Sequence, residues 1–265
     1  MTTVLKGQSG FLTGSTIKII AFVLMVLDHV HQMWAHAGAP LWLTMLGRPV
    51  FPMFLFLITE SFYHTSNRQK LLLRLLIASW IMQFVSLVLG MYLLPNDSII
   101  LLNNAFATFF ITVLYMLFYE IFKGGVKEKS AKKIAGAIGL ALLPILAIIP
   151  VMTAAMAEPP NVWLVRILLF LPNAFVLEGG PFMVILGLAF YILRPWRWAQ
   201  ALALLVLSVL QFVIDPASIQ WLMVFAIIPI FLYNGEKGKG MKNFFYIGYP
   251  LHIWILYIIA TLTVG

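Results

Sequence analysis

Asp28, His29 and Arg48 are the residues of this sequence whose types and spacing could do chemistry. Asp28 and His29 are adjacent near the end of an apolar stretch, and Arg48 follows early in the next one. A charged side chain at membrane depth costs free energy, so it usually has a partner and a function. Imidazole is the side chain whose unperturbed pKa suits proton transfer near pH 7. The three residues therefore predict either a buried acid–base site or an Asp–Arg pair that fixes helix packing, with His29 bonded to an interhelical carbonyl.

Transmembrane helices must position these residues. The chain has 265 residues, of which 62% are hydrophobic and 10% charged, with a mean hydropathy of +0.99. Soluble domains carry about 25% charged residues. Apolar runs near twenty residues cross a bilayer as helices because a helix satisfies its own backbone hydrogen bonds. These values predict an all-α, polytopic membrane protein with a single transmembrane domain over residues 1–265.

The apolar runs and the basic residues together predict a topology. About nine spans are expected: Thr16–Trp34, Leu41–Tyr63, Leu71–Leu94, Ile99–Phe122, Ile134–Met156, Val162–Leu193, Trp198–Ile214, Ile219–Tyr233 and Phe244–Thr263. Lys and Arg concentrate in cytoplasmic loops, and in this sequence every second connection is basic. We therefore expect the N-terminus inside and the C-terminus outside.

One predicted span, Val162–Leu193, is longer than a single crossing requires. It is interrupted at Pro172-Asn173 and at Gly179-Gly180-Pro181. We interpret it as a discontinuous helix, which is tolerated in a membrane where the freed backbone groups face protein or a water-filled cavity. The alternatives are a re-entrant pair and an external loop between two short helices.

The net charge of +8 does not indicate a nucleic-acid ligand, because the basic residues are spread over the predicted cytoplasmic loops. The longest cluster, Lys123 to Lys133, would attract anionic lipid. The chain has no cysteine, which excludes thiolate catalysis and cysteine-ligated metal. We expect a lipid-bilayer partner, no nucleic acid and no metal.

Helix geometry gives the polar cluster a depth and a direction. At about 1.5 Å per residue, His29 lies about 7 Å and Arg48 about 10 Å from the outer ends of their spans. The short loop between the spans, residues 35–40, predicts antiparallel neighbours, so Arg48 is expected either to pair with Asp28 or to hold a negative charge that develops beside His29. Adjacent helical residues point about 100° apart, so Asp28 and His29 cannot project the same way. We expect His29 to point into a cavity as a base, and Asp28 to face a neighbouring helix and hold Arg48 or another donor.

Two prolines lie inside predicted spans. Each frees the carbonyl four residues earlier: Pro52 that of Arg48, and Pro250 that of Tyr246. The segment around Pro250 combines a kink, aromatic side chains and His252. We expect His252 to lie deeper than His29, in a tunnel wall rather than in the same catalytic pair.

Five blocks of the sequence resemble the TraX family, the conjugative F-pilin N-acetylases. The blocks run from Ile17 to His29, from Leu46 to Phe54, over Asn103-Asn104-Ala105-Phe106, over Glu178-Gly179-Gly180, where many relatives have an aromatic residue before the glycine, and from Phe245-Tyr246 to His252. The resemblance implies an acetyl-CoA-dependent acyltransferase, related to membrane acyltransferases that use an embedded histidine. Cytosolic acetyl-CoA would meet an acceptor from the membrane or periplasm, which places the protein in the bacterial inner membrane.

The resemblance also suggests residue roles. His29 is the expected base, Arg48 the electrostatic stabiliser of the oxyanion, and Asp28 the residue that holds Arg48. Further candidates for substrate binding are Asn103, Tyr249, Glu178 and His252. Candidates for binding the phosphates of acyl-CoA are Arg68, Arg74, Arg194 and Arg197, which the positive-inside rule also explains without a ligand.

Several functions remain open from the sequence. The expected acceptor is a pilin N-terminus, and a hydroxyl group of an envelope glycan is an alternative. A covalent acetyl-imidazole on His29 is an alternative to direct transfer. A secondary transporter and a structural pilus- or envelope-assembly protein are the competing classes; a transporter would also use a broken helix and buried ionisable residues.

Overall fold

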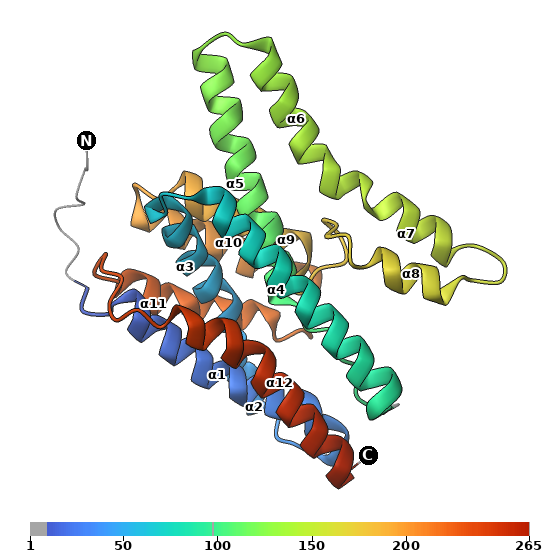
Figure 1. Ribbon diagram of the computed structural model, residues 1–265. Helices are drawn as coiled ribbons and strands as arrows, with labels where there is room; N and C mark the ends of the chain where they lie inside the picture. The colour runs from blue at the N-terminus through green and yellow to red at the C-terminus, as the bar shows by residue number, and fades with distance from the viewer. Residues whose placement is uncertain (1–9, 97, 265) are drawn as a thin grey trace. The chain divides into compact units, whose positions relative to one another are not determined.

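Helices are the only regular secondary structure in the part of the chain that the computed structural model describes, residues 10–96 and 98–264 (Figure 1). The all-α prediction is confirmed for these residues. An isolated parallel β-bridge joins Leu12 to Tyr233. The helices are α1 (Gly14–Trp34), η1 (Ala35–Ala37), α2 (Trp42–Gly47), α3 (Val50–His64), α4 (Arg68–Val88), η2 (Leu89–Leu93), α5 (Ala105–Lys127), α6 (Ala131–Leu146), α7 (Ile148–Ala155), α8 (Val162–Leu168), α9 (Gly180–Ile192), α10 (Arg197–Ile214), η3 (Gln220–Ala226), α11 (Ile227–Phe231) and α12 (Lys242–Val264).

Seven helical stretches of the described residues are long and apolar enough to cross a membrane. They are Gly14–Ala37, Trp42–His64, Arg68–Leu93, Ala105–Lys127, Ala131–Ala155, Arg197–Ile214 and Phe244–Val264. The two remaining predicted spans hold the shorter apolar helices Gly180–Ile192 and Gln220–Phe231. The chain is a multi-pass membrane protein, and the number of nine crossings stays a prediction.

Several predicted spans differ from the helices that form. Helix α5 begins at Ala105 rather than Ile99, because the Asn104 side chain caps it by accepting the N–H of Ala107. The predicted discontinuous span consists of α8 and α9, separated by the non-helical residues 169–179. In that break the Asn173 side chain accepts the N–H groups of Phe175 and Val176, at 3.1 and 2.7 Å. The interruption therefore lies where the sequence predicted it.

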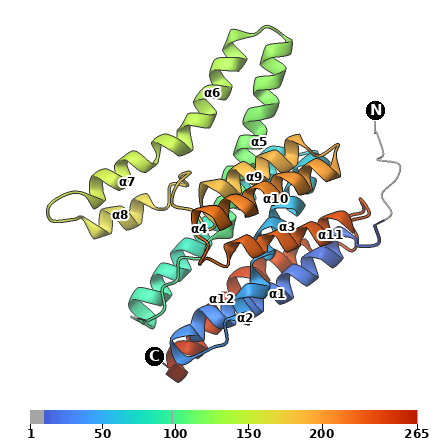
Figure 2. The same ribbon diagram turned by 180° about the vertical axis from the view of Figure 1, so that it is seen from behind.

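The described residues pack into two compact units, one formed by residues 10–57, 85–96, 98–101 and 192–264, the other by residues 58–84 and 102–191. In the first unit, α2 and α12 both pack on α1 (Figure 2). Buried residues recur on α1 at every fourth position and form one stripe: Ile17, Ala21, Met25, His29 and Met33. That spacing follows one face of a helix, so His29 occupies a core position. The single domain over residues 1–265 stays a prediction.

Helix α12 runs parallel to α1. Near the start of both helices, Lys18 Nζ lies 5.7 Å from the centroid of the Phe245 ring. Beyond the end of α1, His36 Nε2 lies 3.4 Å from the carbonyl oxygen of Val264. Parallel helices begin on the same side of a membrane, as the expected topology requires for the first and last spans. The absolute orientation, with the N-terminus inside and the C-terminus outside, stays a prediction.

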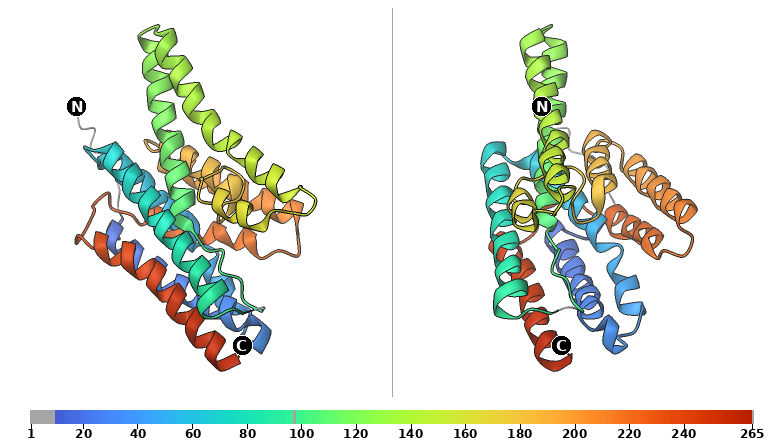
Figure 3. Two further views of the ribbon diagram at one scale, coloured as in Figure 1. Left: turned by 45° about the vertical axis from the view of Figure 1, so that its right-hand side comes forward. Right: turned by 90° about the vertical axis from the view of Figure 1, so that its right-hand side faces the viewer.

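In the second unit, α5 and α6 form a long antiparallel hairpin, and α7 packs against α8 (Figure 3). A polar cluster joins α4, α5 and α9: Glu120 accepts a hydrogen bond of 2.8 Å from the Tyr191 hydroxyl and lies 3.6 Å from Arg68. Arg68 also lies over the Phe62 ring, 4.6 Å from its centroid. These contacts tie the ends of three helices of this unit together.

Candidate functional site

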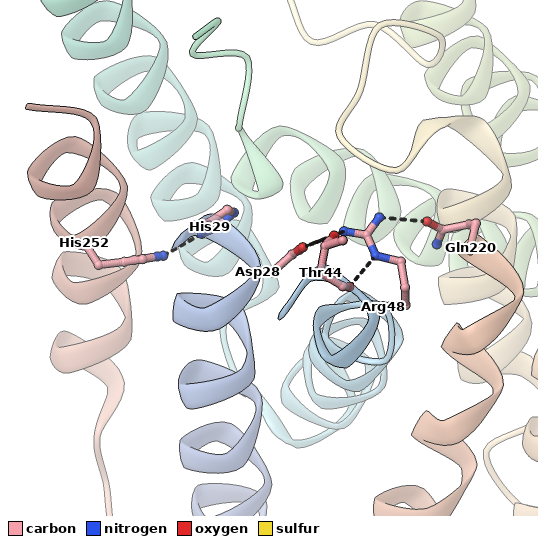
Figure 4. A network of polar contacts seen from close by, with 6 residues as sticks. All are labelled: Asp28, His29, Thr44, Arg48, Gln220 and His252. Carbon is pink, nitrogen blue, oxygen red and sulfur yellow. Dashed lines mark hydrogen bonds and ion pairs between the residues drawn. The ribbon is translucent and has the colours of Figure 1, made fainter. Parts of the chain in front are cut away.

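Helix α1 presents Asp28 and His29 to two different helices (Figure 4). Asp28 faces a neighbouring helix as expected, whereas His29, which was expected to point into a cavity, faces α12. His29 belongs to the buried stripe of α1, retains only 4% of its exposure, and points toward α12. Asp28, one residue earlier, is rotated about 100° around the helix axis and points toward α2. The side chains of Asp28 and His29 therefore extend from the same level of α1 to separate partners.

The predicted ion pair between Asp28 and Arg48 forms. Arg48 Nη2 lies 2.7 Å from Asp28 Oδ1, and the two side chains are 25% and 21% exposed. The Thr44 hydroxyl completes the pair, since it donates to Asp28 Oδ1 at 2.5 Å and accepts from Arg48 Nη2 at 2.7 Å. A hydroxyl has one donor and can accept at the same time, so Thr44 is satisfied by this arrangement.

Pro49 explains why Arg48 lies at a break between α2 and α3. Proline has no N–H to give to the Met45 carbonyl, which instead accepts from Arg48 N at 3.3 Å. The helix resumes at Val50. Arg48 Nε then reaches back to the Thr44 carbonyl at 3.0 Å. The predicted span Leu41–Tyr63 is thus two helices with the catalytic candidate at their junction.

Gln220 at the start of η3 is a further partner of Arg48. Its Oε1 accepts a hydrogen bond of 3.2 Å from Arg48 Nη1. Together, the four hydrogen bonds of Arg48 use four of the five N–H groups of a guanidinium. Arg48 is therefore held in one orientation with one Nη1 hydrogen left over.

Thr44 and Gln220 were missed by sequence reasoning. The signal for Thr44 was its position four residues before Arg48, which puts both on one helix face. Gln220 is a polar residue in the predicted span Ile219–Tyr233, but nothing in the sequence indicated that this span packs near Arg48.

His29 and His252 form a hydrogen-bonded pair, with His29 Nδ1 2.7 Å from His252 Nε2 and the ring centroids 4.9 Å apart. The expectation that His252 lies apart from His29 is therefore wrong. That expectation compared backbone depths along upright helices, whereas the rings meet through side chains that cover much of a helical turn, about 5.4 Å. His252 Nδ1 also lies 2.8 Å from the Gly248 carbonyl.

Aromatic side chains surround the pair. Phe22 packs edge-on against His252 at 5.4 Å, and the ring of the buried Tyr249 lies 6.0 Å from that of His252. The substrate-binding candidates Tyr249 and His252 thus lie together beside His29. Asn103 and Glu178 belong to the second unit, where the Glu178 carbonyl accepts from the Thr108 hydroxyl at 2.8 Å. The substrate-binding roles of all four residues stay predictions.

The four arginines expected at acyl-CoA phosphates divide between the units. In the first, Arg197 lies over the rings of Phe56 and Tyr233, 4.7 and 5.4 Å from their centroids. Arg194 is partly exposed in the same unit. In the second, Arg68 is paired with Glu120, and Arg74 Nε donates to the Lys70 carbonyl at 3.0 Å. Phosphate binding by these residues stays a prediction.

Comparison with known proteins agrees with the resemblance drawn from the sequence blocks. A family model described as TraX protein matches residues 13–260. A probable fimbrial assembly protein, FimC of serogroup H1 from Dichelobacter nodosus, is 29% identical over 259 residues, covering 91% of this chain and 92% of the relative. No solved structure matches the chain.

Proposed function

The chain belongs to the TraX family, and from this premise we propose that it is a membrane-embedded acetyltransferase that moves an acetyl group from acetyl-CoA to an amine or hydroxyl acceptor. The N-terminal amine of a pilin is the first candidate acceptor. One observation carries the proposal: a buried imidazole, His29, lies on the same helix as one half of an oriented Asp28–Arg48 ion pair. A base next to a fixed positive charge is what acyl transfer from a thioester requires.

The reaction needs two proton transfers, one from the acceptor to His29 and one from His29 to the leaving group. The acceptor amine attacks the thioester carbonyl carbon, a C–N bond forms, and His29 takes the amine proton. The C–S bond then breaks, and the imidazolium of His29 returns the proton to the sulfur of CoA. An α-amino group has a pKa near 7.7–8.0, so a base of modest strength suffices.

Arg48 would stabilise the negative charge that develops on the thioester oxygen. Its remaining Nη1 hydrogen is the available donor, and its orientation is fixed by Asp28, Thr44 and Gln220. A donor that is oriented before the reaction costs no reorganisation in the transition state. Asp28 would therefore act through Arg48 rather than on the substrate.

The proposal includes a location and a route. We place the protein as one domain in the bacterial inner membrane, with the basic loops inside and the acetyl-CoA phosphates on the cytosolic side. Arg68, Arg74, Arg194 and Arg197 are the candidates for those phosphates, and Asn103, Glu178, Tyr249 and His252 for contacts with the acyl donor or the acceptor. The acceptor would arrive from the membrane or the periplasm.

Transfer by purified protein tests the proposal. The protein is reconstituted in lipid nanodiscs with acetyl-CoA labelled in the acetyl group and a peptide that has a pilin-type N-terminus, and the same peptide with a blocked N-terminus serves as control. We expect free CoA thiol to appear together with labelled acetyl on the unblocked peptide. Folded protein that neither consumes the thioester nor labels any peptide, pilin or envelope glycan would overturn the proposal.

A label retained on the protein would favour the covalent route. If acetyl-imidazole forms on His29, acid-quenched protein carries the acetyl group on the peptide that contains His29 when the acceptor is omitted. Direct transfer leaves the protein unlabelled. Mass spectrometry of the quenched protein distinguishes the two routes.

The name of the relative favours a second candidate, a pilus-assembly function without group transfer. The two candidates differ in what a variant without the His29 imidazole does in cells. An assembly protein needs no base, so this variant would still support pilus formation and leave the mass of the pilin unchanged. If the protein is an acetyltransferase, the acceptor from cells with this variant would lack one acetyl group.

A further inference from the structure

The two imidazoles at the site are hydrogen-bonded to each other (Figure 4). His252 is also hydrogen-bonded to a backbone carbonyl. His29 Nδ1 lies 2.7 Å from His252 Nε2, and His252 Nδ1 lies 2.8 Å from the Gly248 oxygen. A carbonyl oxygen only accepts hydrogen bonds, so the proton between His252 and Gly248 belongs to His252 Nδ1.

The position of that proton determines where the other protons lie along these hydrogen bonds. A neutral imidazole has one N–H, so His252 carries a lone pair on Nε2. His29 Nδ1 must then donate to this lone pair, because two lone pairs do not form a hydrogen bond. With its proton on Nδ1, neutral His29 carries its lone pair on Nε2. The tautomer of His29 thus follows from a carbonyl on another helix.

We propose that His252 is a positioning residue that holds His29 as the Nδ1-protonated tautomer, so that His29 Nε2 is the nitrogen that takes the acceptor's proton. The tautomer itself follows from the hydrogen bonds alone, whereas its role in catalysis rests on the proposed acetyl transfer. A histidine ring is commonly oriented by the hydrogen bond of its second nitrogen. Here a neutral imidazole takes the place that a carboxylate has in the serine-protease triad.

The fold has features that fix His252 for this role. A Cβ at Gly248 would lie 3.3 Å from a ring carbon of Phe22, so α12 passes close to that ring at the residue whose carbonyl binds His252. Phe22 packs edge-on against the His252 ring as well. The ring of His252 is therefore held from both its backbone side and its face.

The proposed role continues after proton uptake. When His29 Nε2 accepts a proton, His29 becomes an imidazolium with N–H groups on both nitrogens, and Nδ1–H still donates to the lone pair of His252 Nε2. The nearby carboxylate of Asp28 is already paired with Arg48, on a different side of α1. His252 is thus the hydrogen-bond acceptor available at Nδ1 to support the cation.

Nitrogen NMR tests the tautomer without reference to activity. The chain has five histidines, so replacing His31, His36 and His64 by Gln leaves only the pair. In the ¹⁵N-histidine-labelled protein in nanodiscs, we expect His29 Nδ1 to show the shift and proton coupling of an N–H and Nε2 the shift of a bare nitrogen. A neutral His29 with its proton on Nε2 would overturn the proposal.

Two variants of His252 separate positioning from packing. His252→Gln keeps an acceptor oxygen for His29 Nδ1–H, whereas His252→Leu fills similar space without an acceptor. We expect His252→Leu to move His29 toward the other tautomer and to lower kcat for acetyl transfer by roughly 10²-fold. We expect His252→Gln to keep the tautomer ratio of His29 and the kcat each within roughly tenfold of wild type. Equal kcat and equal tautomer populations in the two variants would contradict the positioning role.

The readouts also keep this proposal separate from the proposed function. If wild-type protein transferred no acetyl group, the acetyltransferase proposal and the catalytic half of this one would fail, while the spectrum would still decide the tautomer. If transfer were seen with His29 in the opposite tautomer, only the role of His252 would fail.

Discussion

Gly47 of α2 lies directly against the side chain of Asp28 of α1. A Cβ built at position 47 would lie closer to Asp28 Cβ and Cγ than such atoms approach in proteins. Small residues let membrane helices approach closely. Here the close approach brings the carboxylate to the hydroxyl of Thr44 and the guanidinium of Arg48. Gly47 therefore determines the position of the ion pair without touching the reacting groups.

Replacing Gly47 by Ala should disrupt this geometry. The added methyl group must push Asp28 aside or separate the two helices, which costs about 1–3 kcal/mol of stability as overpacking does. We expect a lower melting temperature and a rate of acetyl transfer that is reduced by roughly tenfold or more. Gly139→Ala in α6 is the matched control, because nothing lies within 4 Å of a Cβ there. Equal effects of the two substitutions would contradict the role of Gly47.

Arg48→Lys keeps the positive charge but removes the guanidinium group with its separate N–H donors. A lysine ammonium cannot hold Asp28, the Thr44 carbonyl and Gln220 from three separate nitrogens as Arg48 does. We expect a loss of kcat of about 10²-fold, of the size found when an oxyanion donor is removed. Arg166→Lys in α8 serves as a control for the same change of side chain. An Arg48→Lys protein with the wild-type kcat would show that charge alone suffices.

Thr44 should act through its hydroxyl. Thr44→Val preserves the shape of the side chain but leaves Asp28 Oδ1 and Arg48 Nη2 each without one partner. An unmade buried hydrogen bond costs about 1–3 kcal/mol, and these partly exposed groups should lose less, so both stability and transfer should fall modestly. Thr44→Ser retains the hydroxyl and should stay close to wild type. If Val and Ser gave the same melting temperature and rate, the hydroxyl would have no part in the network.

The arginines proposed at the acyl-CoA phosphates should affect binding rather than chemistry. We expect Arg74→Ala or Arg194→Ala to raise KM for acetyl-CoA about tenfold, which corresponds to about 1.4 kcal/mol, with kcat unchanged. Lys132→Ala removes one exposed positive charge from the first turn of α6 and controls for net charge. Initial rates over a range of acetyl-CoA concentrations measure both constants. Wild-type KM in alanine variants of all four arginines would exclude their role at the phosphates.

The features that the sequence predicted are local ones. Asp28 and His29 project in different directions because adjacent residues on any α-helix diverge by about 100°. Arg48 meets Asp28 because residues 35–40 leave too little chain for anything but neighbouring helices. The break between α8 and α9 was likewise readable, since Pro172 cannot continue a helix and Asn173 caps the turn after it.

The features that the sequence did not predict depend on lateral packing. Gln220 lies 172 residues from Arg48 and His252 lies 223 from His29, and no local pattern indicates which helices become neighbours. The start of α5 was misplaced because the apolar residues 99–102 extend the span in the sequence, whereas the side chain of Asn104 caps a helix that begins later. Apolar content indicates membrane depth, and capping decides where the helix begins.

The most direct test of the account compares His29→Ala with His36→Ala in the acetyl-transfer assay. His36 is an exposed histidine beyond the end of the same helix, so both variants lose one imidazole from neighbouring positions. We predict that His29→Ala transfers acetyl groups roughly 10²- to 10⁴-fold more slowly than wild type, while His36→Ala stays unchanged. Folded His29→Ala protein that labels the acceptor at the wild-type rate would contradict the assignment of His29 as the base.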